Sequence, residues 1–465
     1  MVEQARQDWA RALPLILALI IFAALSFAPA LFNDGDTSWH LATGRWIIAH
    51  RAIPHADPFS FTFRGHAWTA HEWLVDVAMA AAFALRGWAA LALLFAFSIA
   101  AALGLIAREL VRSHAPRHAV AAVAVTAWVL SPFVLARPHV VTWPLLALWT
   151  LALLRAREAG RAPPLAWALL ILLWANLHAS FLFALLLAAF FGLEALVMEK
   201  GRRREVIVGW GAFGAACAVA ALLTPHGLQG YLYPLQVSGM KALPLIGEWR
   251  ATNLRDGWPF VLFTFAVLLA LVLRWRAVGA VRLLLLAFLA ALAFAHARHQ
   301  PLFAIVAVLI AARLPASGGK LSPLPRNPAL VLLAGALLVS MVRLAIPLQR
   351  GDSPTYPATA LAKLPPELRT RPVLNDYSFG GPLILNDIAP YIDGRSDMYG
   401  DAFTIDHHSM IMGDRAALQR AQQRWKLEWT ILNPDAPLVK VLDSNPEWRR
   451  LYADQVAVVH VRPAT

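Results

Sequence analysis

Long apolar runs, separated by short polar stretches rich in arginine, dominate the chain from residue 12 to residue 346. Runs of about 17 to 25 apolar residues have the length that a helix needs to cross the hydrocarbon core of a bilayer. The pattern therefore predicts a mostly α-helical, polytopic membrane domain over residues 1–348, with about eleven spans. The predicted spans are 12–32, 88–108, 118–136, 140–155, 164–176, 180–198, 206–223, 259–274, 281–297, 301–314 and 328–346.

Basic residues collect at one set of span ends, and this asymmetry predicts the topology. Cytoplasmic loops are enriched in arginine and lysine, so we expect the N-terminus in the cytoplasm. Segments 33–87 and 224–258, and everything after about residue 347, then lie on the opposite face. Residues 71–86 are too short to span and are predicted to form an interfacial helix there. The basic clusters are Arg6/Arg11, Arg108/Arg112/Arg117, Arg155/Arg157/Arg161, Lys200/Arg202/Arg203/Arg204, Arg274/Arg276/Arg282 and Arg313/Lys320/Arg326.

Composition agrees with a membrane protein, since 59% of the 465 residues are hydrophobic and only 15% are charged. Soluble domains carry about a quarter charged residues. The formal charge of +13 does not indicate nucleic acid, because the basic residues lie in short clusters between spans rather than on one face. We therefore expect no nucleic-acid partner. The single cysteine, Cys217, excludes a disulfide framework and a cysteine-based metal site.

After residue 349 the chain becomes first proline-rich and then soluble in composition. Four short runs typical of strands, PVLND, PYIDG, EWTIL and QVAVVHV, alternate with helical stretches near 415–424 and 437–443. Residues 349–465 are therefore predicted to form an α/β domain outside the membrane.

The stretch 33–74 concentrates ionisable residues between two apolar regions. Such groups are costly against a membrane unless they face water or a ligand, so they indicate a functional site. Asp34 and Asp36 follow the first span, where a carboxylate meets a lipid-borne substrate from the side and a water-borne one from above. A carboxylate placed there can accept the proton of a hydroxyl nucleophile. The alternative is a simple turn, because Asn-Asp-Gly-Asp is also turn chemistry.

His71 and Glu72 open the predicted interfacial helix, and two roles are open for them. An acidic residue at a helix N-terminus stabilises the helix dipole. Alternatively, Glu72, His71 and His40 reach the same cavity as the two aspartates and orient an acceptor. Asp36, His40 and Glu72 also offer ligands suited to a divalent cation such as Mg²⁺ or Mn²⁺, which is the one cofactor that the sequence suggests.

Three arginines on the same face, Arg137, Arg298 and Arg250, are candidate ligands for a phosphate. Arginine binds phosphate through a rigid fork of N–H donors. Each can instead extend to lipid headgroups. Arg137 and Arg298 are preferred because each lies at an outer span end.

Asp393, Arg395 and Asp397 follow a predicted strand in the C-terminal domain, where α/β domains often build binding sites. They are predicted to contact an acceptor. The alternative is that Asp393 and Arg395 pair with each other for structural reasons.

The layout resembles the GT-C superfamily of integral-membrane glycosyltransferases, which use polyprenyl-phosphate-linked sugars. The shared features are an acidic first loop after span one, an interfacial helix, about eleven or more spans and an outer C-terminal domain. Two motif blocks are also similar to those of a group of bacterial membrane proteins. The first block comprises Asp34, Asp36, Trp39, His40, Leu41, Gly44, Pro54, Asp57, Phe59, Ser60, Trp68, His71, Glu72, Trp73 and Leu74. The second comprises Asn375, Tyr377, Gly380, Gly381, Ile392, Asp393, Gly394, Arg395 and Asp397.

The resemblance implies that Asp34 or Asp36 is the catalytic base, and Asp36 is our first choice. It implies a multi-pass protein of the bacterial inner membrane, with the catalytic loop 33–87, the loop 224–258 and the domain 349–465 in the periplasm. The expected reaction moves a hexosyl or pentosyl group from a polyprenyl-phosphate donor to a hydroxyl of a glycan, lipid or protein acceptor of the cell envelope. The Asp-Glu pair of the protein O-mannosyltransferase branch is absent, which leaves the donor sugar open.

Two other functions stay open on the sequence. One is a transporter or flippase that binds a lipid-linked sugar without chemistry, and the other is a non-catalytic scaffold of an envelope polysaccharide machine. Transporters tend to have paired broken helices in two repeated halves, whereas the sequence shows one clear break, at Asn176. The chain also lacks a GxxxxGK[ST] motif, which fits a donor already activated on a lipid.

Overall fold

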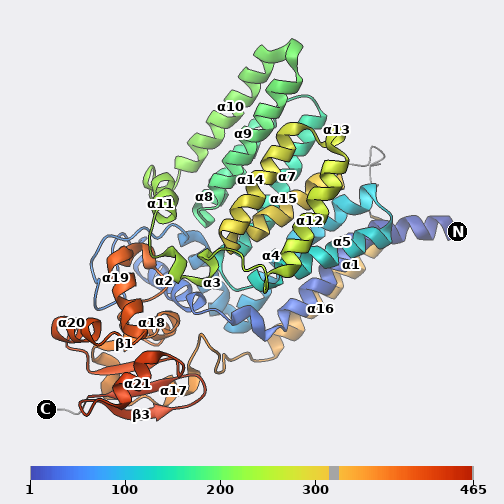
Figure 1. Ribbon diagram of the computed structural model, residues 1–465. Coiled ribbons are helices and arrows are strands. Elements are labelled where there is room, and N and C mark those ends of the chain that lie inside the picture. Colours follow the sequence, from blue (N-terminus) through green and yellow to red (C-terminus); the bar gives the residue numbers. More distant parts are fainter. Residues whose placement is uncertain (1, 314–323, 463–465) are drawn as a thin grey trace.

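The computed structural model describes residues 2–313 and 324–462. Figure 1 shows a bundle of helices with a unit of short helices and strands, formed by the C-terminal part of the chain, at one end. Helices α2 (Asp36–His50) and α3 (Trp73–Arg86) lie between the bundle and this unit. Lys320 and the last residue of the predicted span 301–314 fall outside the described residues.

Within the described part of the chain, six helical segments are long and apolar enough to cross a membrane. A helix satisfies its backbone hydrogen bonds internally, which is why such apolar sequences adopt it in a bilayer. These segments contain α1 (Val2–Ser26), α4 (Trp88–Ser113), α6 and α7 (Pro138–Val141 and Trp143–Glu158), α9 (Phe181–Met198), α10 (Arg203–Leu222) and α16 (Arg326–Ala345).

Five further apolar helices have only 10 to 16 residues. A helix therefore occupies each of the eleven predicted ranges, but eleven crossings are not confirmed. The innermost of these helices, α15, is buried along nearly its whole length and forms the centre of the bundle. The five are α5 (Pro116–Leu130), α8 (Ala168–Leu177), α12 (Trp258–Leu273), α14 (Ala280–Ala295) and α15 (Gln300–Ala312).

Charged residues at the C-terminal end of α4 pair across the bundle. Glu109 forms ion pairs with Arg313 and with Arg112, the latter at 3.2 Å. Nearby, Glu194 pairs with Arg282 at 3.0 Å. Arg112 and Arg313, from separate predicted basic clusters, thus meet at the C-terminal end of α4. This helix has 26 residues and is therefore about 39 Å long, at a rise of 1.5 Å per residue.

The first loop contains two helices rather than one. The predicted interfacial helix over 71–86 matches α3, and α2 packs beside it. Gly44 permits the close approach, because a Cβ atom there would clash with the backbone carbonyl of Asp76. Gly87, with a φ of 60°, separates α3 from α4. The loop is therefore a packed layer at one end of the bundle.

Segment 224–258 carries the amphipathic helix α11 (Gln229–Ser238). Leu228, Leu232 and Leu235 recur at helical spacing and are exposed. On the other side of the helix, Tyr233 is buried. The apolar exposed side suits the surface of a bilayer.

The C-terminal unit contains a four-stranded sheet in the order β1–β2–β4–β3. Strands β1 and β2 pair in parallel, and the other two pairs are antiparallel. Short helices flank the sheet (Figure 1). The strands are β1 (Val373–Asn375), β2 (Trp429–Leu432), β3 (Arg449–Ala453) and β4 (Val458–Val461). The helices are α17 (Ala358–Lys363), α18 (Gly380–Leu385), α19 (Ser396–Ile411), α20 (Arg415–Trp425) and α21 (Pro437–Asp443).

One predicted strand in this unit is wrong. The run PYIDG forms no strand, because the side chain of Asn375 takes the place of a strand partner. The Asn375 amide oxygen accepts the Tyr391 N–H at 2.8 Å, and its amide nitrogen donates to the Ile392 carbonyl at 2.8 Å. The sheet instead recruits β3, whose exposed and charged residues hid it from the pattern of apolar positions.

Candidate functional site

Asp34 and Asp36 lie at the N-terminus of α2. The Asp34 carboxylate accepts the backbone N–H of Asp36 at 2.8 Å, and this turn fixes both side chains where the chain leaves α1. Gly35 lies between them and packs so closely on the C-terminal unit that a Cβ atom would clash with the backbone of Ser378. The turn chemistry seen in the sequence is therefore real, and it positions the two carboxylates.

Arg137 joins the two aspartates to a third carboxylate. It precedes α6, and its guanidinium pairs with Asp34 at 3.0 Å, with Asp36 and with Glu248. Arg298 also pairs with Glu248, at 3.3 Å. We call Asp34, Asp36, Glu248 and the shared Arg137 the acidic cluster. It gathers residues from the first loop, the start of α6 and the segment 224–258.

Burial and charge set opposite proton affinities within the acidic cluster. Burial raises the pKa of Asp36 to about 7, against the opposing effect of Arg137. Burial likewise raises the pKa of Asp34. Burial also acts upward on Glu248, but Arg137 and Arg298 outweigh it and hold its pKa at about 2. Glu248 is therefore ionised at neutral pH, whereas the pKa of Asp36 lies near neutral pH, which suits a general base.

Arg350 secures the backbone beneath the two aspartates. Its guanidinium donates to the carbonyl oxygens of Phe32 and Asp34, at 2.7 and 3.2 Å, and to the Ser38 hydroxyl at 3.1 Å. The same guanidinium lies 4.2 Å from the ring of Tyr356. The segment after α16 therefore braces the start of α2.

Glu72 is surrounded by three histidines. His178 lies at 3.3 Å from its carboxylate, His40 at 3.6 Å and His71 at 3.7 Å. The other nitrogen of His40 contacts Asp76 at 2.7 Å. We call Glu72, His40, His71 and His178 the histidine cluster. Three of its members were predicted from sequence, and His178 comes from the break between α8 and α9.

Burial dominates the proton affinities of the histidine cluster. It raises the pKa of Glu72 to about 8 and lowers that of His71 to about 3. The pKa of His40 is also lowered by burial. Glu72 therefore carries a proton at neutral pH, and the neighbouring imidazoles are neutral partners for it.

The predicted metal ligands are divided between two clusters. Within residues 2–313 and 324–462, no group of three or more His, Cys, Asp or Glu side chains is arranged to hold a metal ion. Asp36 contacts Arg137, whereas His40 and Glu72 belong to the histidine cluster. The Mg²⁺ or Mn²⁺ prediction stays a prediction without a ligand group in this fold.

Asp393 and Arg395 form a sealed structural contact with the first loop. Arg395 binds Asp393 through two nitrogens at 2.6 and 2.7 Å and reaches Asp57 at 2.7 Å. Tyr399 donates its hydroxyl to Asp393 at 2.7 Å, and Ser60 donates to Asp57 at 2.5 Å. We call Asp57, Asp393, Arg395 and Tyr399 the junction cluster.

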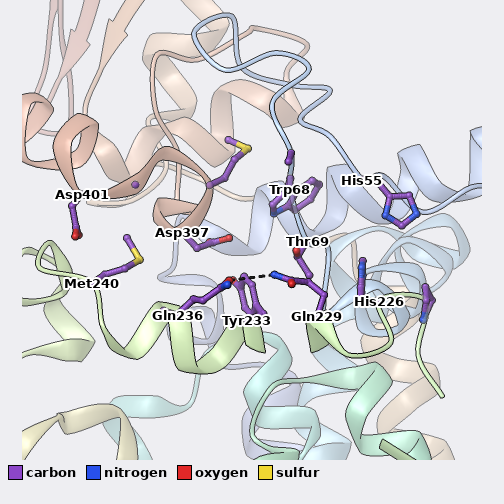
Figure 2. Close-up of a pocket in the computed structure, with 15 residues that line it drawn as sticks. His55, Trp68, Thr69, His226, Gln229, Tyr233, Gln236, Met240, Asp397 and Asp401 are labelled. Carbon is purple, nitrogen blue, oxygen red and sulfur yellow. Dashed lines mark hydrogen bonds between the residues drawn. The ribbon is translucent and has the colours of Figure 1, made fainter. Parts of the chain in front are cut away.

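The side chains of Arg395, Asp393 and Asp57 are at most 1% exposed. An acceptor does not reach Asp393 or Arg395 in this arrangement, so the structural alternative that the sequence left open describes them. Asp397 is different. It lines a cavity of about 620 Å³ together with Trp68, Tyr233 and other residues (Figure 2). Burial raises the pKa of Asp397 to about 6.

Arg250 does not join the acidic cluster. It is exposed and donates to the carbonyl of Pro244 at 3.0 Å. In the same GEWR sequence it is Glu248 that joins the acidic cluster, and the sequence pattern did not predict this. The signal available was its position, two residues before Arg250 in a loop predicted on the outer face.

Comparison with known proteins identifies the fold. The structure is similar to the crystal structure of the Archaeoglobus fulgidus oligosaccharyltransferase in the apo form, with a TM-score of 0.55 and 12% identity, over 90% of this chain and 69% of that chain. It is also similar to that enzyme tethered to an acceptor peptide containing the NVT sequon, with a TM-score of 0.54 and 12% identity, over 91% and 69% of the two chains. No protein-family model and no curated protein matches the sequence. The fold is GT-C-like, as the layout of the sequence predicted.

Proposed function

We propose that the protein is a membrane glycosyltransferase that moves a sugar from a polyprenyl-phosphate donor to an acceptor hydroxyl on the periplasmic face of the bacterial inner membrane. The observation that carries the proposal is the acidic cluster. It places Asp36, with a pKa near 7, beside arginines at one end of a GT-C-like helix bundle. The oligosaccharyltransferases of the same fold are named for glycosyl transfer, which supports the same reaction class here.

Asp36 is the proposed catalytic base. In the reaction, the bond between the anomeric carbon and the phosphate oxygen breaks while the bond to the acceptor oxygen forms. The acceptor proton moves to Asp36, and the electron pair of the broken bond leaves on the polyprenyl phosphate. A single displacement of this kind inverts the anomeric configuration. Asp34 shares Arg137 with Asp36 and is the second choice of base.

Arg298 is the proposed first contact of the donor phosphate. Its guanidinium lies 4.1 Å from the ring of Trp249, and about a quarter of its side chain is exposed. Arg137 is committed to three carboxylates, so its role is to hold them in place and to balance the charge that develops as phosphate departs. Glu72 and the histidines beside it orient the acceptor.

The test measures turnover of labelled polyprenyl-phosphate hexoses and pentoses by the purified full-length protein, with an envelope extract as the source of acceptor. Replacing the base, Asp36→Asn, is expected to lower turnover by about 10² to 10⁴-fold, the range for losing general-base catalysis. The exposed outer-loop change Asp256→Asn is the control and is expected to leave turnover unchanged.

Equal turnover by the native protein, Asp36→Asn and Asp34→Asn, including no turnover by any of them, contradicts the proposal. Retained binding of the lipid without any turnover favours a transporter instead. Thermal unfolding of each variant separates lost chemistry from lost folding.

A further inference from the structure

The cavity in Figure 2 lies outside the acidic cluster and is built by three distant segments. The first loop contributes Trp68 and Thr69, and α19 contributes Asp397. Helix α11 turns the side opposite its exposed leucines to the cavity. The residues of α11 that line it are Gln229, Tyr233, Gln236 and Val237. A volume of about 620 Å³ is in the range of small-molecule binding sites.

The charge of the cavity excludes a phosphate as its natural occupant. Its described lining includes two carboxylates, Asp397 and Asp401, and two histidines, His55 and His226, but neither lysine nor arginine. Asp401 already accepts the backbone N–H of Ala242 at 2.8 Å. The arginines suited to a phosphate belong to the acidic cluster instead. The carboxylates that line the cavity therefore disfavour a phosphate or another anionic group as its occupant.

The polar groups of the cavity suit a ligand with many hydroxyls. The amides of Gln229 and Gln236 contact each other at 3.2 Å, and each amide both donates and accepts hydrogen bonds. Tyr233, Trp68 and Asp397 line the cavity together (Figure 2). Flat aromatic faces next to amides and a carboxylate match a pyranose, which has an apolar C–H face and a rim of hydroxyls.

The cavity also connects to the groups that the reaction uses. The ring of Tyr233 lies 4.2 Å from that of His71, which belongs to the histidine cluster. Asp397 lies three residues after Gly394 in the sequence, and Gly394 packs directly on the carboxylate of Asp36. Gly400, at φ 73° and ψ 172°, breaks α19 so that Asp397 and Asp401 lie on either side of the kink. That backbone conformation belongs to glycine.

We propose that this cavity is the acceptor site of the proposed glycosyltransferase and that it takes a neutral glycan, not an anionic glycan or a peptide. The inference rests on the proposed function and specifies its acceptor class. Gln229 and Asp397 bind the acceptor hydroxyls, and Tyr233 and Trp68 contact the sugar face. Gln236, which is exposed, lines the cavity beside them. His71 of the histidine cluster contacts the ring of Tyr233.

The single cysteine makes a direct binding test available. Cys217 is buried, so a thiol introduced at the exposed Gln236 is the one that reacts readily with a maleimide. The labelling rate of the Gln236→Cys protein is measured with cellotriose, maltotriose, chitotriose or mannotriose, with trigalacturonate, and with trialanine. The matched control is Gln419→Cys, at an exposed glutamine of α20 outside the cavity.

At least one neutral trisaccharide is expected to slow labelling of Gln236→Cys by about threefold or more at millimolar concentration, where weak small ligands bind. Labelling of Gln419→Cys is expected to stay unchanged. Adding Asp397→Asn to Gln236→Cys should reduce the protection, whereas adding Asp406→Asn, farther along α19, should not. The inference is overturned if no neutral trisaccharide protects, or if trigalacturonate or trialanine protects equally well.

This assay contains no donor, so its outcome is separate from that of the turnover assay. Protection without turnover supports the sugar site and contradicts the proposed reaction. Turnover that depends on Asp36 without protection contradicts the sugar site alone.

Discussion

The acidic cluster and the junction cluster both combine arginine with carboxylates, but they differ in how far they are buried. In the junction cluster, Arg395 and its carboxylates are at most 1% exposed, and tyrosine and serine hydroxyls complete their hydrogen bonds. In the acidic cluster three carboxylates share Arg137, and the side chains are 8% to 24% exposed. A fully buried ion pair whose hydrogen bonds are all made fixes two parts of a chain together. When several carboxylates share one arginine and remain partly exposed, a carboxylate can exchange its proton.

The largest expected effect comes from breaking the junction. Removing the guanidinium with Arg395→Met leaves Asp57 and Asp393 buried without their cation, which is expected to destabilise the protein by about 3–5 kcal/mol. Denaturant or thermal unfolding measures the change. The same substitution at the exposed pair with Asp406, Arg420→Met, is the control, at under about 1 kcal/mol. Equally small losses of unfolding free energy in both variants would show that the Arg395 ion pairs are not buried from water.

Gly394 lies between Asp393 and Arg395 of the junction cluster and packs on Asp36 of the acidic cluster, so Gly394→Ala tests the contact between the two clusters. A Cβ atom there would clash with the carboxylate of Asp36 and the indole of Trp39. Displacing the base is expected to lower turnover by about 10 to 100-fold, because misplacing a reacting group by about 1 Å costs that much. Gly351→Ala, where a Cβ atom meets nothing, is the control. Unchanged turnover in Gly394→Ala at a temperature where it is folded would remove Asp36 from the role of base.

The pH dependence of stability separates the site from the junction further. The pKa of Glu72 rises from 4.5 to about 8 on folding, so the folded protein holds a proton that the unfolded chain releases. The resulting stability is complete below about pH 4.5 and is lost as the pH rises through about 8. Glu72 alone should lower the free energy of unfolding by up to about 1.4 kcal/mol per pH unit in that window.

Unfolding of the Glu72→Gln protein between pH 5 and 8, compared with that of the native protein, checks this expectation about Glu72. The variant should lose that part of the slope, whereas Glu367→Gln, at an exposed glutamate, should keep it. Parallel curves for the native protein and Glu72→Gln would mean that Glu72 is ionised in the fold.

The smallest effect is expected at Arg250. Its side chain is exposed and donates to the Pro244 carbonyl, whereas Arg137 and Arg298 pair with Glu248. Arg250→Ala should change stability by less than about 0.5 kcal/mol and leave turnover unchanged. Arg298→Ala, assayed beside it, should raise the donor concentration needed for half-maximal turnover. The reverse pattern would assign the donor phosphate to Arg250.

Much of the fold follows from the sequence because apolar runs and charged ends report directly on helices in a membrane. The ranges of α3, α20 and α21 follow from local patterns. The strand β3 and the loop at PYIDG do not, because charged exposed residues and one asparagine side chain decide them. Local sequence does not record which side chain replaces a strand partner.

The candidate site was predicted in part, for a similar reason. The aspartates and Arg137 lie next to predicted span ends, and Glu72 opens the predicted interfacial helix, so a site at this end of the bundle could be anticipated. Their partners Glu248 and Arg350 lie more than a hundred residues away, in segments whose approach depends on the packed fold. The Asp–Arg pairs of the acidic cluster and those of the junction cluster differ in burial, and a sequence does not show this difference.

A structure of the full-length protein with a bound polyprenyl-phosphate sugar tests the role of Asp36 as the base most directly. We expect the phosphate within hydrogen-bond distance of the Arg298 guanidinium, with the carboxylate of Asp36 facing the anomeric carbon and the cavity of Figure 2 open beside it. Phosphate bound instead at the Glu109–Arg313 end of the bundle, or an Asp36 carboxylate turned away from the lipid, would contradict this expectation.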